Sequence, residues 1–155
     1  MEWNDFETEM PVYEDGGRIL GSMISAPALV QKDLPPVRFL VDGLLPQGLT
    51  LIASPPKYGK SWLVLDLCLA VAAGKPFLGR ETEKATCLYL ALEDSEVCLK
   101  SRILKLLNGD EVPDKLHLTT VSPALGDGLI EELTQAAKAY ADLDLVVIDT
   151  FQMIR

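Results

Sequence analysis

Apolar residues along this chain gather in short runs that are separated by longer segments with helical periodicity. The short runs, bounded by turn-forming residues, predict buried strands at Leu49–Ala53, Thr86–Leu92, Lys115–Thr120 and Leu143–Asp149. The intervening segments predict helices, the first largely apolar, at Gly59–Gly74, Ser95–Leu107 and Leu129–Ala141. Apolar strands that alternate with helices predict an α/β fold, with a mostly parallel sheet and helices on both faces.

Residues that commonly begin or end helices stand at the expected places. Gly74 closes the first predicted helix, and Pro76 follows two residues later. Ser95 is the predicted N-cap of the second helix, and Asn108 followed by Gly109 closes it. These signals set the boundaries of both helices independently of the apolar pattern.

The N-terminal residues differ from the rest of the chain. Residues 1–34 are acidic and lack sustained periodicity, which predicts a flexible arm with one short helix near Ala28–Lys32. Pro35 and Pro36 mark the entry to a single domain over residues 35–155. Within it, Val37–Val41 predicts a short strand and Asp42–Gly48 a turn.

Composition narrows the class of protein. The 155 residues are 48% apolar and 24% charged, which is typical of one soluble globular domain. No apolar run reaches transmembrane length, and the N-terminus is acidic where a signal peptide would be basic, so we expect a cytoplasmic protein with no membrane contact. The net charge of −9 argues against a wide basic surface for duplex DNA, although a local basic channel stays open.

The cysteines and the single histidine do not form a recognisable site. Cys68, Cys87 and Cys98 show no C-x-x-C spacing and are interpreted as reduced packing residues. His117 lies in a predicted strand without partners at metal-ligand spacing, which favours a structural role.

Candidate chemistry lies just past the predicted strands. Parallel sheets bind ligands at the carboxyl ends of their strands. The residues at those positions are Ser54–Ser61, Glu93–Asp94 and Asp149–Thr150. They combine a loop rich in backbone donors with a lysine, a hydroxyl group and carboxylates, which suits a bound nucleotide and its metal ion.

The first of these segments predicts a phosphate-binding loop. Gly59, Lys60 and Ser61 follow a predicted strand and open a helix, although Ser54 stands where the usual G-x-x-x-x-G-K-[ST] motif has its first glycine. We infer that this position needs no positive φ. Backbone N–H groups from Lys57 to Ser61 would hold the phosphates of ATP at the helix N-terminus, where Gly59 allows close approach. Lys60 would reach the β- and γ-phosphates, and the Ser61 hydroxyl would coordinate Mg²⁺.

Other residues of the loop carry weaker expectations. Ser54, Tyr58 and Trp62 are candidate nucleotide contacts because they lie in the loop or next to it. Core packing for Trp62 and surface exposure for Tyr58 are the more ordinary explanations. Alternatively, the G-K-S tripeptide opens an ordinary helix by chance, but its position between a strand and an apolar helix argues against chance.

Carboxylates at the other two strand ends complete the candidate site. Asp149 ends an apolar strand and is the candidate Walker B aspartate that holds Mg²⁺ together with Ser61; alone, it would be interpreted as a strand-end turn residue. Glu93 is the candidate base that polarises water for attack on the γ-phosphate. Asp94 is expected to cap the following helix, and both acids could be caps. Arg102 could approach the adenine or lie on the surface.

These motifs together resemble a known family. The segments VDGLLPQGLTLIASPPKYGKSWLVLDLCLAVAAGKPFLG, CLYLALEDS and LDLVVIDTFQ occur in the order found in RecA-like ATPases of the RepA type, the hexameric replicative helicases of plasmids and their relatives in mobile elements. The resemblance runs from about Val37 to the end. It implies a phosphate and Mg²⁺ role for Lys60 and Ser61, a catalytic glutamate at Glu93 and a Walker B aspartate at Asp149.

The resemblance also implies partners, and this sequence differs from the family at one place. Family members form homo-hexamers, act on DNA and receive an arginine finger from a neighbouring subunit. The family's core continues past the Walker B strand with a strand that lies next to the loop strand, whereas this sequence stops at Arg155. We therefore expect residues 35–155 to be an incomplete domain with at most weak nucleotide binding. A gap or an abnormal closure is expected between Leu49–Ala53 and Leu145–Ile148.

Three functions are compatible with the sequence. The first is ATP binding and hydrolysis coupled to DNA replication or unwinding. The second is a non-catalytic nucleotide-binding remnant, and the third is a P-loop kinase, for which the sequence shows no arginine-rich lid. A dinucleotide-binding site would require G-x-G-x-x-G after a strand, and a serine or cysteine triad would require a suitably placed histidine; the sequence has neither.

Overall fold

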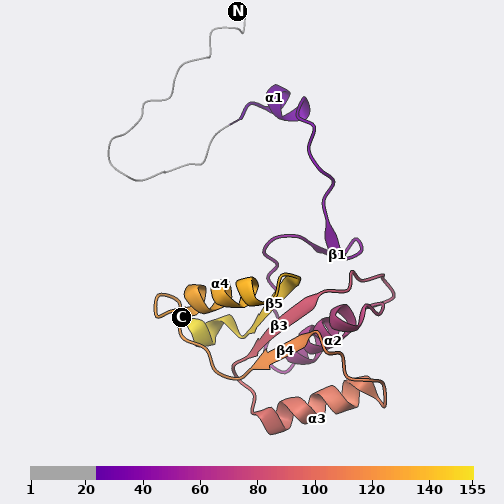
Figure 1. Cartoon of the computed structure of the whole chain (residues 1–155), viewed down its shortest axis with the longest axis vertical. Coiled ribbons are helices and arrows are strands. Elements are labelled where there is room, and N and C mark those ends of the chain that lie inside the picture. Colours follow the sequence, from indigo (N-terminus) through magenta and orange to yellow (C-terminus); the bar gives the residue numbers. More distant parts are fainter. Residues whose placement is uncertain (1–23) are drawn as a thin grey trace, which may run out of the picture. The chain divides into compact units, whose positions relative to one another are not determined.

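The computed structural model describes residues 24–155 (Figure 1). The chain divides into two compact units, one up to Pro36 and one from Val37 onward. The described part of the first unit contains one short helix, α1 (Ala26–Val30), where the Ser25 side chain accepts a hydrogen bond from the Ala28 N–H at 3.4 Å. This helix overlaps the one expected near Ala28–Lys32. Residues 1–23 of the predicted arm lie outside the described residues.

The second unit contains the alternating strands and helices that the apolar pattern predicts. Its strands and helices are β1 (Phe39–Val41), β2 (Leu45–Pro46), α2 (Lys60–Ala73), β3 (Thr86–Ala91), α3 (Glu96–Leu107), β4 (Leu116–Thr119), α4 (Leu129–Ala139), β5 (Leu143–Asp149) and the 3₁₀ helix η1 (Phe151–Ile154). The boundaries of α2 and α3 follow the capping signals, because Gly74 and Asn108 both adopt left-handed backbone conformations at the C-caps.

The main sheet has three parallel strands in the order β4-β3-β5 (Figure 1). Strand β3 is central, and its Leu88 pairs with His117 on one side and with Val146 on the other. Parallel strands joined through helices confirm the predicted α/β fold. The sheet brings the carboxyl ends of β3 and β5 together, since Ala91 is opposite Asp149.

Both faces of this sheet are covered by helices (Figure 1). Alternate residues of β3, Cys87, Tyr89 and Ala91, belong to a core shared with α2 and with Leu99 of α3. The intervening Leu90 packs in a second core with Leu129 of α4 and Ile154 of η1. This alternation follows from the two-residue period of a strand and explains why β3 is apolar on both faces after Thr86.

The prediction of a strand at Leu49–Ala53 is wrong. These residues adopt no regular secondary structure, and Leu49 and Leu51 are 100% and 81% exposed. Strand β5 is the edge of the sheet, and a cavity of about 1030 Å³ is lined both by residues 49–52 and by residues 143–148. A strand needs a hydrogen-bonded neighbour, and this segment has none on the β5 side. The two segments thus line one cavity and do not pair with each other.

Two smaller differences lie just before this segment. The strand expected at Val37–Val41 is shorter and starts at Phe39. The expected turn at Asp42–Gly48 contains β2, which pairs antiparallel with β1.

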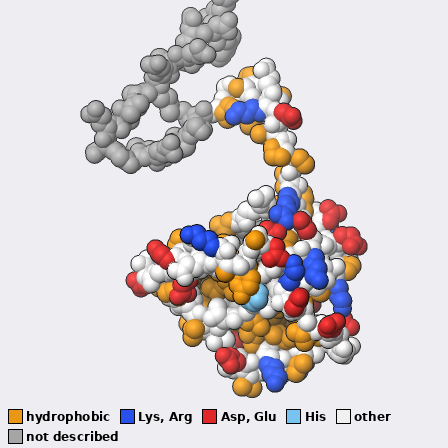
Figure 2. All heavy atoms as spheres, viewed as in Figure 1, with side chains coloured by type: hydrophobic (Ala, Val, Ile, Leu, Met, Phe, Trp, Pro, Cys, Tyr) orange, Lys and Arg blue, Asp and Glu red, His pale blue; other side chains and the backbone are white. Residues whose placement is uncertain are grey.

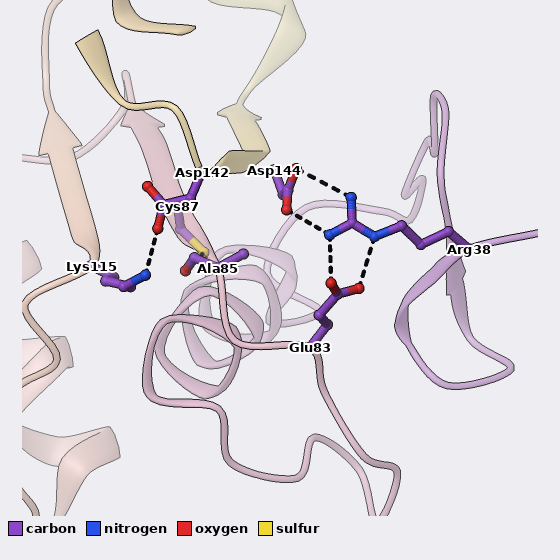
Figure 3. Close-up of polar contacts among 7 residues, drawn as sticks. All are labelled: Arg38, Glu83, Ala85, Cys87, Lys115, Asp142 and Asp144. Carbon is purple, nitrogen blue, oxygen red and sulfur yellow. Dashed lines mark hydrogen bonds and ion pairs between the residues drawn. The ribbon is translucent and has the colours of Figure 1, made fainter.

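Arg38 ties three separate segments of the second unit together (Figure 3). Its guanidinium donates two hydrogen bonds to Glu83, at 2.6 and 2.8 Å, and two to Asp144 of β5, at 2.7 and 3.4 Å. This pairing raises the pKa of Arg38, and the hydrogen bonds from Arg38 lower the pKa of Glu83. Figure 3 also shows Lys115 paired with Asp142 at the start of β5. The ion pairs lie at the end of β5 opposite to Asp149.

The cysteines and the histidine have structural surroundings. Cys68 and Cys87 are buried and Cys98 is exposed, and all three are free thiols. A hydrogen bond with Cys87 and burial raise the pKa of the Cys68 thiol. The His117 ring lies 4.2 Å from the ring of Tyr140, centroid to centroid.

Candidate nucleotide-binding site

The loop before α2 presents backbone donors at a helix N-terminus. Gly59 is the N-cap with a φ of 82°, a conformation that glycine adopts without strain. The first helical hydrogen bond runs from the Leu63 N–H to the Gly59 carbonyl, at 2.9 Å. The N–H groups of Lys60, Ser61 and Trp62 therefore precede the helical ladder and have no intrahelical acceptor. Such donors bind anions, and the helix dipole adds to the attraction.

The serine that replaces the first glycine of the motif is accommodated without backbone strain. Among the described non-glycine residues, a positive φ occurs at Lys57, Leu78 and Asn108, and not at Ser54. This confirms the inference that the Ser54 position needs no positive φ. The left-handed residue of the loop is Lys57, with a φ of 68°.

Lys60 bends back onto the start of its own loop. Its ammonium Nζ donates to the Ser54 carbonyl at 2.9 Å, to the Ser54 hydroxyl at 3.2 Å and to the Pro55 carbonyl at 3.0 Å. The residue in place of glycine thus supplies two of the three acceptors. A phosphate group bound by Lys60 would replace some of these neutral acceptors with charged oxygens, which form stronger hydrogen bonds.

Asp149 ends β5 as a nearly buried carboxylate. It is 9% exposed, and its Oδ2 accepts a hydrogen bond of 2.7 Å from the hydroxyl of Tyr89, which is 0% exposed. The peptide bond that follows Asp149 is cis. Burial, and secondarily the hydrogen bond to Asp149, raise the pKa of Tyr89, so the hydroxyl remains a proton donor. Sequence reasoning missed Tyr89, because a tyrosine in an apolar strand has the signature of a packing residue.

Glu93 and Asp94, which follow β3, have different partners. The Thr150 hydroxyl donates to Oε1 of the exposed Glu93 at 2.9 Å, which links the two strand ends. The Asp94 side chain pairs with Arg102, so the expectation that Asp94 caps α3 is wrong. The α3 N-cap is Ser95, whose hydroxyl accepts from the Cys98 N–H at 3.3 Å.

The two aromatic residues beside the loop differ in their surroundings: Tyr58 is exposed, as its more ordinary explanation predicted, whereas Trp62 belongs to neither apolar core and lines the cavity described below. Trp62 is half-buried, and the guanidinium of Arg102 lies 5.6 Å from its ring centroid, within range of a cation–π interaction. Tyr58 is 77% exposed. Arg102 is therefore held by Trp62 and Asp94 and is not a freely extended surface residue.

One cavity brings most of the predicted site residues together. Its lining includes residues from the loop, from the start of α2 and from the ends of β3 and β5: Ser54, Lys57, Gly59, Lys60, Ser61, Trp62, Glu93 and Asp149. Tyr58 is the predicted site residue that does not line it. The cavity is the same one that separates β5 from residues 49–52, and it is large enough for a nucleotide.

The donors in this cavity suit a hard cation. Within residues 24–155 there is no cluster of three or more histidine, cysteine, aspartate or glutamate side chains able to hold a metal ion by itself. The Ser61 hydroxyl and the Asp149 carboxylate are oxygen donors of the kind that Mg²⁺ prefers. Because Mg²⁺ is usually bound by one or two protein oxygens plus substrate phosphates, this donor set fits a metal ion that arrives with a nucleotide.

The family comparison agrees with this fold and loop. A family model described as an AAA domain matches residues 22–155, which is most of the chain. The chain belongs to this family of P-loop ATPase-like domains, and its AAA domain is of the nucleotide-binding type. No curated protein and no solved structure matches the chain. Among the described residues, no helix has the length and apolar character needed to cross a membrane.

Proposed function

We propose that this chain is a RecA-like ATPase of the RepA type that couples ATP binding and hydrolysis to DNA replication or unwinding in the cytoplasm. Membership of the AAA domain family supports the ATPase part of the proposal. The order of the three resembling segments supports the RepA-type part. So does the position of Glu93, which follows β3 and does not adjoin Asp149 in the sequence.

The main support for the proposal is that four functional groups line one cavity. Lys60 and Ser61 come from the start of α2, Glu93 from the end of β3 and Asp149 from the end of β5. These elements are far apart in the sequence, and the parallel sheet with its covering helix brings their ends to one edge. A chance G-K-S tripeptide would not account for two carboxylates at the same cavity.

Each group has a role in phosphoryl transfer to water. The N–H groups of the first turn of α2 bind the phosphates, and Lys60 balances their charge. Ser61 and Asp149 would hold Mg²⁺, which when bound neutralises charge that develops on the phosphate oxygens. Glu93 accepts a proton from water as the water oxygen forms a bond to the γ-phosphorus. The bond from that phosphorus to the β,γ-bridging oxygen breaks, and ADP and inorganic phosphate are released.

DNA contact and oligomerisation are the finer parts of the proposal. The chain has a net charge of −9, and Figure 2 shows basic and acidic side chains interspersed on the visible face. A single copy therefore has little electrostatic attraction for duplex DNA. We propose that DNA is bound by a homo-oligomer, a hexamer by resemblance. In such a ring, local basic residues of several copies face one channel, and a neighbouring copy supplies the arginine finger.

ATP hydrolysis, with and without single-stranded DNA, tests this proposal in this chain and in a version extended by the strand that follows the Walker B strand in the resembling family. Hydrolysis is expected from the extended version, and at most weak nucleotide binding from this chain alone. We expect Glu93→Gln to bind ATP without turnover and Lys60→Ala to lose binding. The matched controls are Glu131→Gln and Lys138→Ala on α4, whose side chains are exposed and do not line the cavity. Unchanged turnover in Glu93→Gln would refute the assignment of the base. Transfer of the γ-phosphate to an acceptor other than water would indicate a kinase.

A further inference from the structure

Tyr89 and Asp149 meet because of the strand register. Tyr89 is opposite Val147, and Ala91 is opposite Asp149, on the paired strands β3 and β5. Residues two apart on a strand share a face, so Tyr89 and Asp149 are diagonal neighbours, within reach of a side chain as long as tyrosine. The hydrogen bond of 2.7 Å between the Tyr89 hydroxyl and Oδ2 of Asp149 bridges this diagonal.

The Tyr89 hydroxyl offsets part of the free-energy cost of burying the Asp149 carboxylate. Asp149 is 9% exposed, and no lysine, arginine or histidine of residues 24–155 forms an ion pair with it. A buried carboxylate without a cation requires hydrogen bonds. The Tyr89 hydroxyl supplies one such hydrogen bond, to Oδ2 of Asp149. One oxygen of Asp149 is thereby engaged on the protein side.

The other oxygen of the Asp149 carboxylate, Oδ1, lacks a side-chain hydrogen bond of this kind within residues 24–155. Asp149 nevertheless lines the cavity that Ser61 also lines. A hydrogen bond from a fully buried tyrosine to one oxygen restricts the rotation of the carboxylate, and it leaves the second oxygen available to a ligand in the cavity.

From this geometry we propose that Tyr89 is a positioning residue for metal binding, which orients the Asp149 carboxylate toward the Mg²⁺ of a bound nucleotide. The inference rests on the proposed nucleotide site and extends it to a residue outside the motif. The ring of Tyr89 packs in the core, whereas its hydroxyl donates a hydrogen bond to Asp149. Hydrogen-bond partners of metal ligands typically contribute ten- to hundredfold to metal affinity.

The test compares Tyr89→Phe with the wild-type chain in titrations of a fluorescent ATP analogue, first in EDTA and then at increasing free Mg²⁺. Phenylalanine keeps the buried ring and removes only the hydroxyl. We expect metal-free binding of the analogue to stay within about twofold of wild type and the apparent Mg²⁺ affinity to fall about ten- to hundredfold. Tyr140→Phe, at an exposed tyrosine outside the cavity, should change neither.

A second variant separates positioning from general structural damage. In an Asp149→Asn background, Tyr89→Phe should cause no further loss of Mg²⁺ affinity, because the two side chains act through one interaction. Wild-type Mg²⁺ dependence in Tyr89→Phe would overturn the proposal. Equal losses with and without Mg²⁺ would overturn it too, since they indicate a structural role. If the wild-type chain itself shows no Mg²⁺-dependent binding of the analogue, the proposed function fails first, and this inference with it.

Discussion

The substitution Leu65→Ala tests how the apolar face of α2 holds the candidate site in place. Leu65 is 0% exposed and lies in the main core, one turn after Lys60 and Ser61. Removing its outer carbons forfeits about 2.4 kcal/mol of burial, at about 0.8 kcal/mol for each of about three methylene equivalents. The cavity that remains adds to this loss, since Leu→Ala substitutions in cores cost about 2.7 to 5.0 kcal/mol. We expect a loss of unfolding free energy of about 3 to 5 kcal/mol.

Leu63→Ala is the matched control on the same helix. Leu63 is 39% exposed, so the lost burial is smaller and solvent fills the space that the side chain leaves. We expect a loss of about 1.5 kcal/mol or less. Both changes place the same residue in the same helix, so their difference reports burial and not helix propensity.

Urea unfolding followed by circular dichroism measures both variants, with the slope of each transition used to confirm comparable unfolded states. The expected order is wild type, then Leu63→Ala, then Leu65→Ala, with the larger step at Leu65. Equal losses at the two positions, or a larger loss at Leu63, would refute the burial of Leu65 and hence the packing of α2 on the sheet.

Three further predictions concern single side chains. Thr150→Val removes the hydrogen bond that holds Glu93. It should therefore lower the rate of ATP hydrolysis about two- to tenfold, measured in single-turnover assays, without changing ATP affinity. Ser95→Ala should cost about 1 kcal/mol in urea unfolding, since it removes the N-cap of α3. Arg38 lowers the pKa of Glu83, so this pair stabilises the fold above the unfolded pKa of the carboxyl and loses the effect as pH falls. Glu83→Gln should therefore flatten the acid side of the stability profile, below about pH 4.5.

The helices and most strands could be predicted because their signals are local. The apolar run of α2 is followed by a glycine at the left-handed C-cap, and α3 begins at a serine whose hydroxyl caps it. Backbone conformation at Gly74 and Ser95 depends on the residue itself and on its neighbours in the chain. Strand β5 was predicted at its observed bounds, Leu143–Asp149, because its run of apolar residues ends sharply in a carboxylate.

The conformation of Leu49–Ala53 could not be predicted from its local sequence. Its apolar run has the composition of a buried strand, yet a strand exists only where another strand supplies hydrogen bonds. Whether the segment has such a neighbour depends on the arrangement of the whole sheet, in which β5 is separated from it by the cavity. The apolar pattern contains no information about this spacing.

Some residues of the candidate site could be predicted from the sequence, and others are identified only by the fold. The loop, Glu93 and Asp149 could be selected because strand ends of a parallel sheet lie at one edge. The hydrogen bonds from Tyr89 to Asp149 and from Thr150 to Glu93 connect residues that are distant in the sequence, and they depend on the register of β3 against β5. Neither partner has a distinctive residue pattern, so only the folded arrangement identifies them.

Isothermal titration of the chain with ATP in Mg²⁺ measures whether the loop before α2 binds the nucleotide. We expect saturable binding by wild type and a loss of at least about tenfold in affinity for Lys60→Ala, because a charge-assisted hydrogen bond contributes about 1.5 to 3 kcal/mol. Lys138→Ala, on α4 and outside the cavity, should bind as wild type does. Absence of binding by wild type, or equal affinities for wild type and Lys60→Ala, would show that this loop is not a nucleotide-binding loop.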